Sequence, residues 1–215
     1  MPRHFSLDTN QFEDGTYELA AEVTSIYNTH AKSSIRFAIE NWTELVDDLQ
    51  PPLDGWFGPV DRTETTSKTD GWEFAVDSPD MFFGDAHRMV RSGPSTESLT
   101  WSLPGLYDFT LTLYARNLNV DDAVSKLKEN VRKETVGNVE KTVRIDISAD
   151  EATWTAADYK VDVADSTDEW LKLHITGKPP EDFQANYLRV TLTSSDLPAD
   201  SVQLGRVHIR ASSNR

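Results

Sequence analysis

Short runs of alternating apolar and polar residues recur along most of the chain, and this pattern predicts β-strands. In the clearest run, residues 107–114 (YDFTLTLY), the odd-numbered positions are apolar, and the other side carries Asp108, Thr110, Thr112 and Tyr114. Strict alternation of this kind is typical of a strand with one buried face. A separate strand is expected just before it, at 98–103 (SLTWSL), ended by a turn at Pro104-Gly105. Trp101 in that strand, and Trp72 further upstream, are expected in the core.

The same alternation returns after residue 138 and predicts five more strands, at 139–148, 159–163, 170–176, 187–193 and 201–210. Turn signals separate the strands by 8–15 residues, so about eight strands between 72 and 211 predict an all-β fold, a two-sheet antiparallel β-sandwich. Between 119 and 138 the apolar residues instead recur every three or four positions. This spacing predicts one short amphipathic helix inserted between strands and ended by Gly137.

The N-terminal part, residues 1–43, predicts a β-hairpin of its own. Residues 17–24 and 33–40 both alternate, and a turn at Asn28-Thr29-His30 separates them. A lone two-stranded hairpin is marginally stable in water, so we expect it to dock on the main body; the alternative is that the sequence cuts through a larger domain. Residues 44–70 are expected to be a connector with a helical turn at 45–49, stopped by Pro51-Pro52. Residues 71–215 then form the sandwich.

The charge of the chain excludes one large class of partner. With 36 acidic and 21 basic residues, the net charge is −15, which is unsuited to a nucleic-acid backbone. No apolar run approaches the ~18 residues that a membrane-spanning helix needs. The chain contains no cysteine, Gly-rich phosphate loop, HExxH or GxSxG sequence. Its first residues are not a signal peptide, so we expect a piece of a longer exported protein.

Several phrases, in their order along the chain, resemble a known family. They are FGDAHR at 83–88, SADEATWT at 148–155, YLRV at 187–190 and QLGRVHI at 203–209. Together they resemble the galactose-binding-like jelly-roll carbohydrate-binding modules of secreted bacterial polysaccharide-degrading enzymes, over about residues 70–211. Glu151-Ala152 departs from the usual Asp-Gly turn, and the helix at 119–138 is extra. The resemblance implies a jelly roll, an extracellular location and carbohydrate binding, although some members are only spacers. Residues 5–42 resemble the closing strands of bacterial immunoglobulin-like spacer domains.

The polar sides of the C-terminal strands are mostly basic and aromatic, although the chain as a whole is acidic. The expected carbohydrate-binding residues are Arg144, Trp170, Lys172, His174, Tyr187, Arg189, Arg206 and His208, with the loop rings Trp56 and Trp154. Arginine forks pair with carboxylates and flat rings stack on sugars, so an anionic polysaccharide is the expected ligand. Three alternatives stay open: these positions are an ordinary solvated face, the strands divide between the two sheets, or the Trp56 ring plugs the core.

These observations predict a non-catalytic module, with no catalytic residues, that holds a secreted multidomain enzyme on a polysaccharide. We expect a monomer whose other partners are the remaining domains of that enzyme. One alternative is a polysaccharide lyase, which would use His174, Tyr187, Arg189 and Arg206. Another is a ligand-free spacer or adhesin domain. No cofactor is expected; a structural calcium is the alternative to solvated acidic loops near Asp54, Asp61, Asp77 and Asp80, none with EF-hand spacing.

Overall fold

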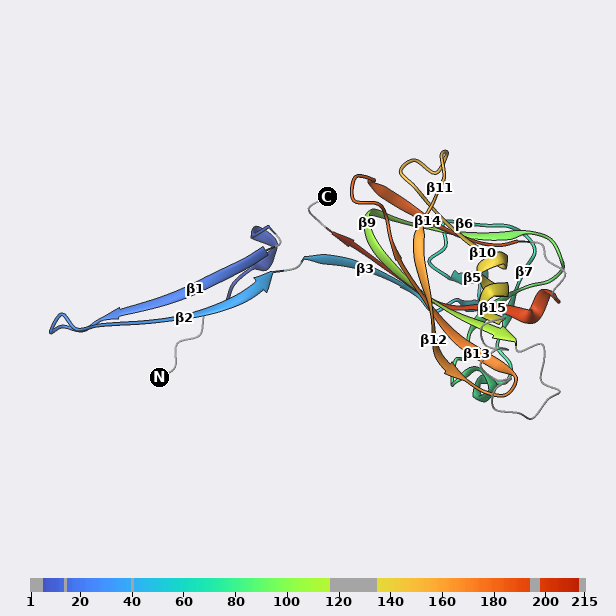
Figure 1. Ribbon diagram of the computed structural model, residues 1–215, viewed down its shortest axis with the longest axis horizontal. Helices are drawn as coiled ribbons and strands as arrows, with labels where there is room; N and C mark the ends of the chain where they lie inside the picture. Colours follow the sequence, from blue (N-terminus) through green and yellow to red (C-terminus); the bar gives the residue numbers. More distant parts are fainter. Residues whose placement is uncertain (1–5, 14, 40, 117–134, 194–197, 213–215) are drawn as a thin grey trace. The chain divides into compact units, whose positions relative to one another are not determined.

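The computed structural model describes residues 6–13, 15–39, 41–116, 135–193 and 198–212 (Figure 1). Contacts divide the chain into two compact units. The first is Met1–Thr43 with Ser212–Arg215, and the second is Glu44–Ala211.

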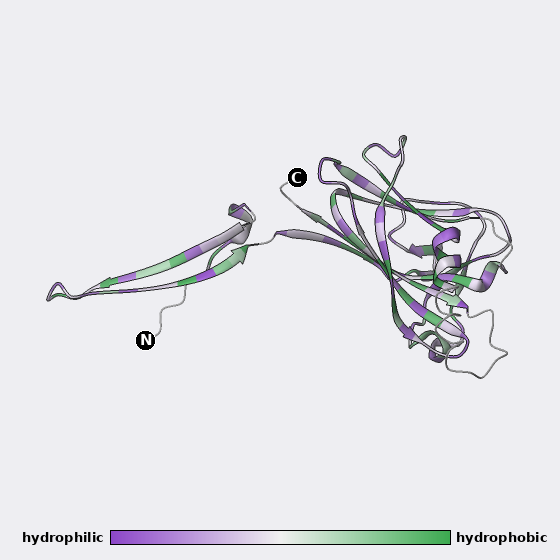
Figure 2. Ribbon diagram, viewed as in Figure 1, coloured by the Kyte–Doolittle hydropathy of each residue, from purple (hydrophilic) through white to green (hydrophobic). Residues whose placement is uncertain are grey.

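The first unit contains the predicted hairpin. A 3₁₀ turn at Thr9–Gln11 precedes strands β1 (Gly15–Thr24) and β2 (His30–Ile39), which pair antiparallel without a break in register. Asn28 adopts a positive φ of 61° in the turn between them, a conformation that asparagine tolerates. Apolar and polar residues alternate along both strands, as Figure 2 shows. The predicted hairpin is therefore confirmed, and its docking stays a prediction.

The remaining strands, apart from β4 (Gln50–Gly55) and β5 (Gly58–Arg62), which pair only with each other, form two layers joined through one shared strand. The strands of the layers are β3 (Trp42–Asp47), β6 (Ser67–Lys68), β7 (Trp72–Ala75), β8 (Arg88–Arg91), β9 (Glu97–Arg116), β10 (Val143–Ser148), β11 (Thr155–Ala156), β12 (Asp158–Ser166), β13 (Trp170–Lys178), β14 (Ala185–Leu192) and β15 (Val202–Ser212). One layer has the order β12-β13-β9-β15-β8-β7, with β3 also on β15. The other has the order β11-β10-β14-β9, with β6 also on β9. The antiparallel β-sandwich predicted from the sequence is confirmed.

Strand β9 belongs to both layers because it bends in the middle. Its first part pairs with β14, from Leu192 opposite Glu97 onward, and its second part pairs with β13 and β15. Gly105, with a φ of 76°, lies between the two parts. The predicted turn that ends a strand at Pro104-Gly105 is therefore wrong. The chain bends there without leaving the sheet, because glycine accepts the left-handed backbone conformation that the bend needs.

The apolar sides of both layers pack into one core. The inward residues of β9, β10, β13, β14 and β15 are buried, including Leu111, Ile145, Leu173, Val190 and Val207. These are the positions that the alternation predicts, because successive side chains in a strand point to opposite faces. Trp101 is fully buried, as predicted, whereas Trp72 is partly buried at the edge of the same core.

Several local predictions are wrong. Residues 45–49 form no helical turn; they belong to β3 and to the corner before β4, where Leu49 has a φ of 49°. Pro51 and Pro52 lie inside β4, whose register with β5 shifts between Gln50 and Leu53, and a shifted edge strand tolerates residues without an N–H. Most of the helix predicted at 119–138 lies outside the described residues. The structure has a helix at 135–142, so Gly137 lies within a helix rather than ending one. Residues 139–142, predicted as the start of a strand, are therefore helical, and β10 begins only at Val143.

Gly177 on β13 lies where a side chain has no room, which gives a test of the packing. A Cβ atom there would contact the Phe109 ring and lie 2.7 Å from the Asp158 carbonyl oxygen. We expect Gly177→Ala to lower the free energy of unfolding by about 2 kcal/mol, the usual effect of overpacking. Urea denaturation measures this. Gly137→Ala, where a Cβ meets no atom within 4 Å, is the control; equal behaviour of the two variants would contradict the packing.

Candidate functional site

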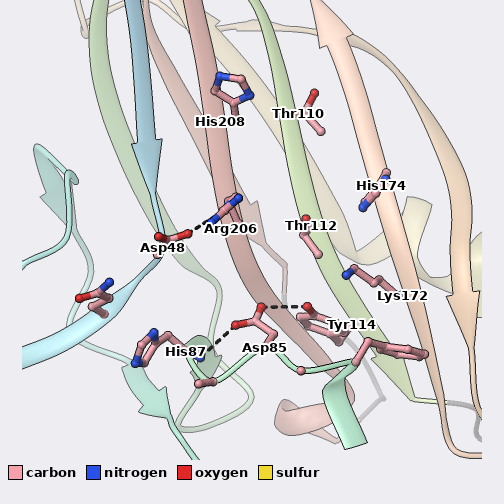
Figure 3. Close-up of a pocket in the computed structure, with 14 residues that line it drawn as sticks. Asp48, Asp85, His87, Thr110, Thr112, Tyr114, Lys172, His174, Arg206 and His208 are labelled. Atoms are coloured by element: carbon pink, nitrogen blue, oxygen red, sulfur yellow. Dashed lines mark hydrogen bonds and ion pairs between the residues drawn. The ribbon is translucent and has the colours of Figure 1, made fainter. Parts of the chain in front are cut away.

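A pocket of about 650 Å³ lies on the outer face of the layer that contains β13, β9 and β15 (Figure 3). Its floor is polar and consists of Thr110, Thr112, Lys172, His174, Arg206 and His208. Its walls are the corner at residues 83–87 and the segment that contains Asp48 and Gln50. All of these residues belong to the unit Glu44–Ala211.

Strand register brings the floor residues together. His174 on β13 lies opposite Thr112 on β9, and Lys172 lies opposite Tyr114. On the other side of β9, His208 on β15 lies opposite Thr110. Residues opposite each other in antiparallel strands share a face. Three neighbouring strands therefore present their polar side chains to one cavity while their apolar side chains fill the core.

The corner at residues 83–87 forms one wall of the pocket. It follows a 3₁₀ turn at Pro79–Phe82, and Phe83 and Gly84 both have positive φ values, of 57° and 85°. Asp85 accepts hydrogen bonds from the backbone N–H of His87 (3.0 Å) and from the Tyr114 hydroxyl (2.8 Å). Burial, together with the Asp85 carboxylate, raises the pKa of Tyr114 far above its ordinary value. Tyr114 is thus held as a hydrogen-bond donor.

Arg88 fixes this wall to the sheet. Its side chain is fully buried and donates hydrogen bonds to Gln203 Oε1 on β15 (2.9 Å) and to the carbonyl oxygens of Asp85 (2.5 Å) and Asp77 (2.7 Å). Its guanidinium carbon lies 3.7 Å from the centre of the Phe82 ring. Burial lowers the pKa of Arg88, and the negative charges of Asp85 and Asp77 oppose that change.

An aromatic cluster closes the pocket beside Tyr114. The Phe82 ring lies 4.6 Å from the Trp170 ring and 5.4 Å from the Tyr114 ring, and Phe83 stacks on Tyr114 at 6.2 Å. Trp170 is only 5% exposed. It shares the outer face of β13 with Lys172, as the alternation implies, but Phe82 covers its ring. Trp170 is therefore a packing residue, and the prediction that it stacks on a sugar is wrong.

Most charges in the pocket are already paired. Arg206 donates from Nε to Asp48 at 2.6 Å, and this contact raises the pKa of Arg206. His208 Nε2 lies 3.5 Å from a carboxylate oxygen of Glu44. Lys172 differs from these: within the part of the chain that the structure describes, its ammonium group makes no hydrogen bond or ion pair. It is a cation available to a ligand.

The other predicted basic residues lie in the second layer, away from this pocket. Asp146, which is buried, accepts hydrogen bonds from Arg144 (2.9 Å) and from Arg189 (3.0 Å). The Arg189 guanidinium also lies 4.0 Å from the centre of the Trp154 ring. Tyr187 is on β14 of the same layer. The predicted basic face is thus split between the layers, because neighbours in sequence order belong to different sheets.

This split also separates the residues expected for a lyase. His174 and Arg206 line the pocket, whereas Tyr187 and Arg189 belong to β14 in the other layer. A base and a carboxylate-neutralising cation must reach one reacting carbon, so that particular set of four cannot act together.

Trp56 lies outside both groups. It is at the tip of the β4–β5 hairpin and is 95% exposed, and the neighbouring Phe57 is 100% exposed. The alternative in which Trp56 plugs the core is therefore wrong. The ring is free in solution, as a stacking surface requires.

Metal and membrane sites receive no support from the described residues. In those ranges no three His, Asp or Glu side chains gather as metal ligands, and no helix has the length and apolarity to cross a membrane. Asp61, one of the acidic loop residues considered for calcium, is instead bound to the backbone N–H of Thr63 (2.9 Å), which lowers its pKa.

Sequence reasoning missed most residues of the pocket, among them Asp48, Asp85, Thr110, Thr112 and Tyr114. A signal for three of them was present, because Thr110, Thr112 and Tyr114 form the outward side of the most clearly alternating strand. Asp85 lies within the FGDAHR phrase. Asp48 had no such signal, since it follows a strand that the sequence did not reveal.

No family model matches the chain, and no curated protein matches it. Similar solved structures include three that contain carbohydrate-binding modules. The CBM51-2 module of Clostridium perfringens ZmpB in complex with GlcNAc and INT domains is 12% identical, with a TM-score of 0.37, and the alignment covers 94% of this chain and 38% of that one. The M60 catalytic domain with CBM51-1 and CBM51-2 from the same protein is 11% identical over 94% and 18%, with a TM-score of 0.34.

A structure from a study of promiscuous carbohydrate-binding modules of the β-sandwich superfamily is 12% identical over 93% of this chain and 74% of that one, with a TM-score of 0.30. The chain thus spans well under half the length of the first two structures. Likenesses at these TM-scores carry no argument about the chain, so its function has to be argued from the pocket.

Proposed function

We propose that this chain is a non-catalytic carbohydrate-binding module whose ligand occupies the pocket between β13, β9 and β15. The observation that carries the proposal is the polar floor that three strands build around Lys172, whose ammonium group has no partner among the described residues. A sheet face that served only solubility would not need a concave wall fixed over it by a buried arginine. The volume of about 650 Å³ lies within the range of roughly 300–1,000 Å³ that is usual for ligand pockets.

The chemistry of the pocket suits a sugar. Carbohydrates present hydroxyl groups that both donate and accept hydrogen bonds. The Thr110 and Thr112 hydroxyls can do the same, and the carboxylates of Asp48 and Asp85 accept. Phe83, which lines the same cavity, offers an aromatic surface for the C–H groups of a sugar ring.

An acidic sugar fits better than a neutral one because of Lys172. The charges of Arg206 and Asp48 cancel, and the buried Arg88 guanidinium offsets the charge of the Asp85 carboxylate. Lys172 is thereby the pocket cation that a ligand carboxylate or sulfate can pair with. A charge-assisted hydrogen bond of this kind is roughly twice as strong as a neutral one.

Catalysis by the pocket tyrosine is disfavoured. Tyr114 donates to Asp85, and its raised pKa keeps it protonated, so it cannot accept a proton from a substrate. A binding module leaves the ligand unchanged. We further propose that the module is a monomer and works outside the cell, where it holds the other domains of an enzyme on a polysaccharide.

Lys172→Met tests whether Lys172 binds the acidic group of the ligand. We expect the affinity for polygalacturonate to fall about tenfold, because one charge-assisted contact contributes about 1.5–3 kcal/mol and about 1.4 kcal/mol is a factor of ten. Isothermal titration calorimetry of the chain measures it, with fully methyl-esterified polygalacturonate as the neutral ligand. Lys178→Met, on the same strand and exposed, is the matched control.

The outcomes separate the parts of the proposal. Loss of affinity in Lys172→Met alone, for the acidic polymer alone, is the expected result. If the esterified polymer binds equally well and Lys172→Met changes nothing, the acidic preference is wrong. If a panel of acidic and neutral polysaccharides shows no binding at all, the carbohydrate-binding proposal fails.

A further inference from the structure

All histidines of the unit Glu44–Ala211 line one pocket. The chain has five histidines, of which His4 and His30 belong to the first unit. The other three, His87, His174 and His208, come from a loop and from two strands that are far apart in sequence, and all three line the pocket (Figure 3). Only 14 residues line it, so chance alone rarely places every histidine of a unit of this size there.

Strands β13 and β15 could have carried another polar residue in place of His174 and His208. Threonine occupies the equivalent outward positions of β9, between the two histidine-bearing strands. Histidine is the side chain that changes charge between about pH 5 and 8. On acidification, this pocket can therefore gain up to three positive charges around Lys172, whereas the rest of its unit has no histidine to titrate.

We propose that the pocket binds acidic carbohydrates more tightly at mildly acidic pH, because protonated His174, His208 and His87 add to the charge of Lys172. This inference rests on the proposed function and assumes the same ligand, an acidic carbohydrate. It concerns the regulation of the site: the histidines set the pH range in which the module holds its ligand.

The neighbours of His174 favour a large gain in ligand affinity when its ring is protonated. Lys172 lies on its own strand, and Thr112 of β9 is uncharged. From β12, Asp162 lies opposite His174, but Lys160 already donates to that carboxylate at 2.8 Å. Within the described residues, His174 makes no hydrogen bond or ion pair. Its protonated ring is thus free to pair with an anionic ligand.

The neighbours of His208 and His87 favour smaller effects. Glu44 of β3 lies 3.5 Å from His208 Nε2 and would pair with the protonated ring; Arg206 and Arg210 of the same strand are already paired with Asp48 and Asp108. His87 lines the same pocket as the carboxylates of Asp85 and Asp48. Because nearby carboxylates would partly neutralise the protonated rings of His208 and His87, we expect His174 to contribute most to the rise in affinity.

Titration calorimetry of the full chain with polygalacturonate, between about pH 8 and about pH 5.5, tests the proposal. We expect the affinity to rise on acidification by about two- to fivefold per histidine, the range of a partly exposed charge pair. His174→Asn with His208→Asn should remove most of the rise between about pH 8 and about pH 5.5. His30→Asn, in the hairpin, should keep the full rise.

A second measurement reads the histidines directly. By linkage, a ligand that binds the protonated ring better must move its titration midpoint to higher pH. We expect the ring signals of His174 and His208 in NMR spectra to show this shift with polygalacturonate and no shift with the methyl-esterified polymer. This readout also reveals a variant that is misfolded, because its remaining signals would change.

Three results would overturn the inference, and they differ in whether the proposed function is retained. Binding that needs Lys172 but does not vary with pH keeps the proposed function and removes the pH dependence. An equal rise for the esterified polymer shows that acid acts through something other than ligand charge. No binding to either polymer at any pH defeats the inference together with the proposed function.

Discussion

Arg88→Met should lower the free energy of unfolding by about 4 kcal/mol, the largest effect we expect from a single substitution. The arginine side chain is fully buried and satisfies three acceptors, Gln203 Oε1 and the carbonyl oxygens of Asp85 and Asp77. Methionine fills similar volume but donates no hydrogen bond, and each buried acceptor left without a partner costs about 1–3 kcal/mol. The desolvation of the arginine charge, which opposes its stabilising effect, is removed as well.

Urea denaturation measured by fluorescence gives this change, with Arg62→Met as the control because Arg62 is exposed on the edge hairpin. We expect the control to stay within about 0.5 kcal/mol of the parent chain. Because Arg88 fixes the wall of the pocket, Arg88→Met should also weaken polygalacturonate binding. A stable Arg88→Met chain with unchanged affinity would refute this role.

Asp47→Ala should lower the free energy of unfolding by about 3 kcal/mol. This buried carboxylate accepts hydrogen bonds from Trp101 Nε1 (2.8 Å), from the backbone N–H of Leu49 (2.8 Å) and from that of Glu64 (2.9 Å). Removing it leaves three donors without partners, one of them on a fully buried tryptophan. The corner after β3, which carries Asp48 into the pocket, would lose its attachment to β9.

Asp47→Asn separates charge from hydrogen bonding, since an amide oxygen can still accept from one or two of the donors. We expect its effect to be intermediate, and Asp54→Ala, on the exposed hairpin, to have almost none. Thermal and urea unfolding of the four chains give the comparison. An Asp47→Ala chain as stable as Asp54→Ala would show that the three contacts contribute nothing.

The sequence predicted the strands well because their alternation is local. Residues two apart on a strand share a face whatever the partner, so Leu111 and Val207 could be assigned to the core from their neighbours alone. The bend at Gly105 was misread, because a turn and a bend within a strand have the same glycine signal.

The candidate site was only partly predictable, because it depends on which strands become neighbours. Lys172, His174, Arg206 and His208 were named correctly as one outward set, and β9 joins their two strands. Arg144 and Arg189 looked equivalent in sequence yet lie in the other layer. Nothing local distinguishes the two groups, since layer membership is decided by pairing between distant strands. The covering of Trp170 by Phe82 is likewise a long-range contact.

The bend in β9 has a consequence for how the sandwich folds. Because one strand contributes hydrogen bonds to both layers, neither layer can complete its pairing until β9 is in place. Its partners are distant in sequence, as Thr110 and His208 are, and such non-local pairings make folding slow. Amide hydrogen exchange should therefore find the slowest amides of both layers, on β13 and on β14, opening together in a single global event.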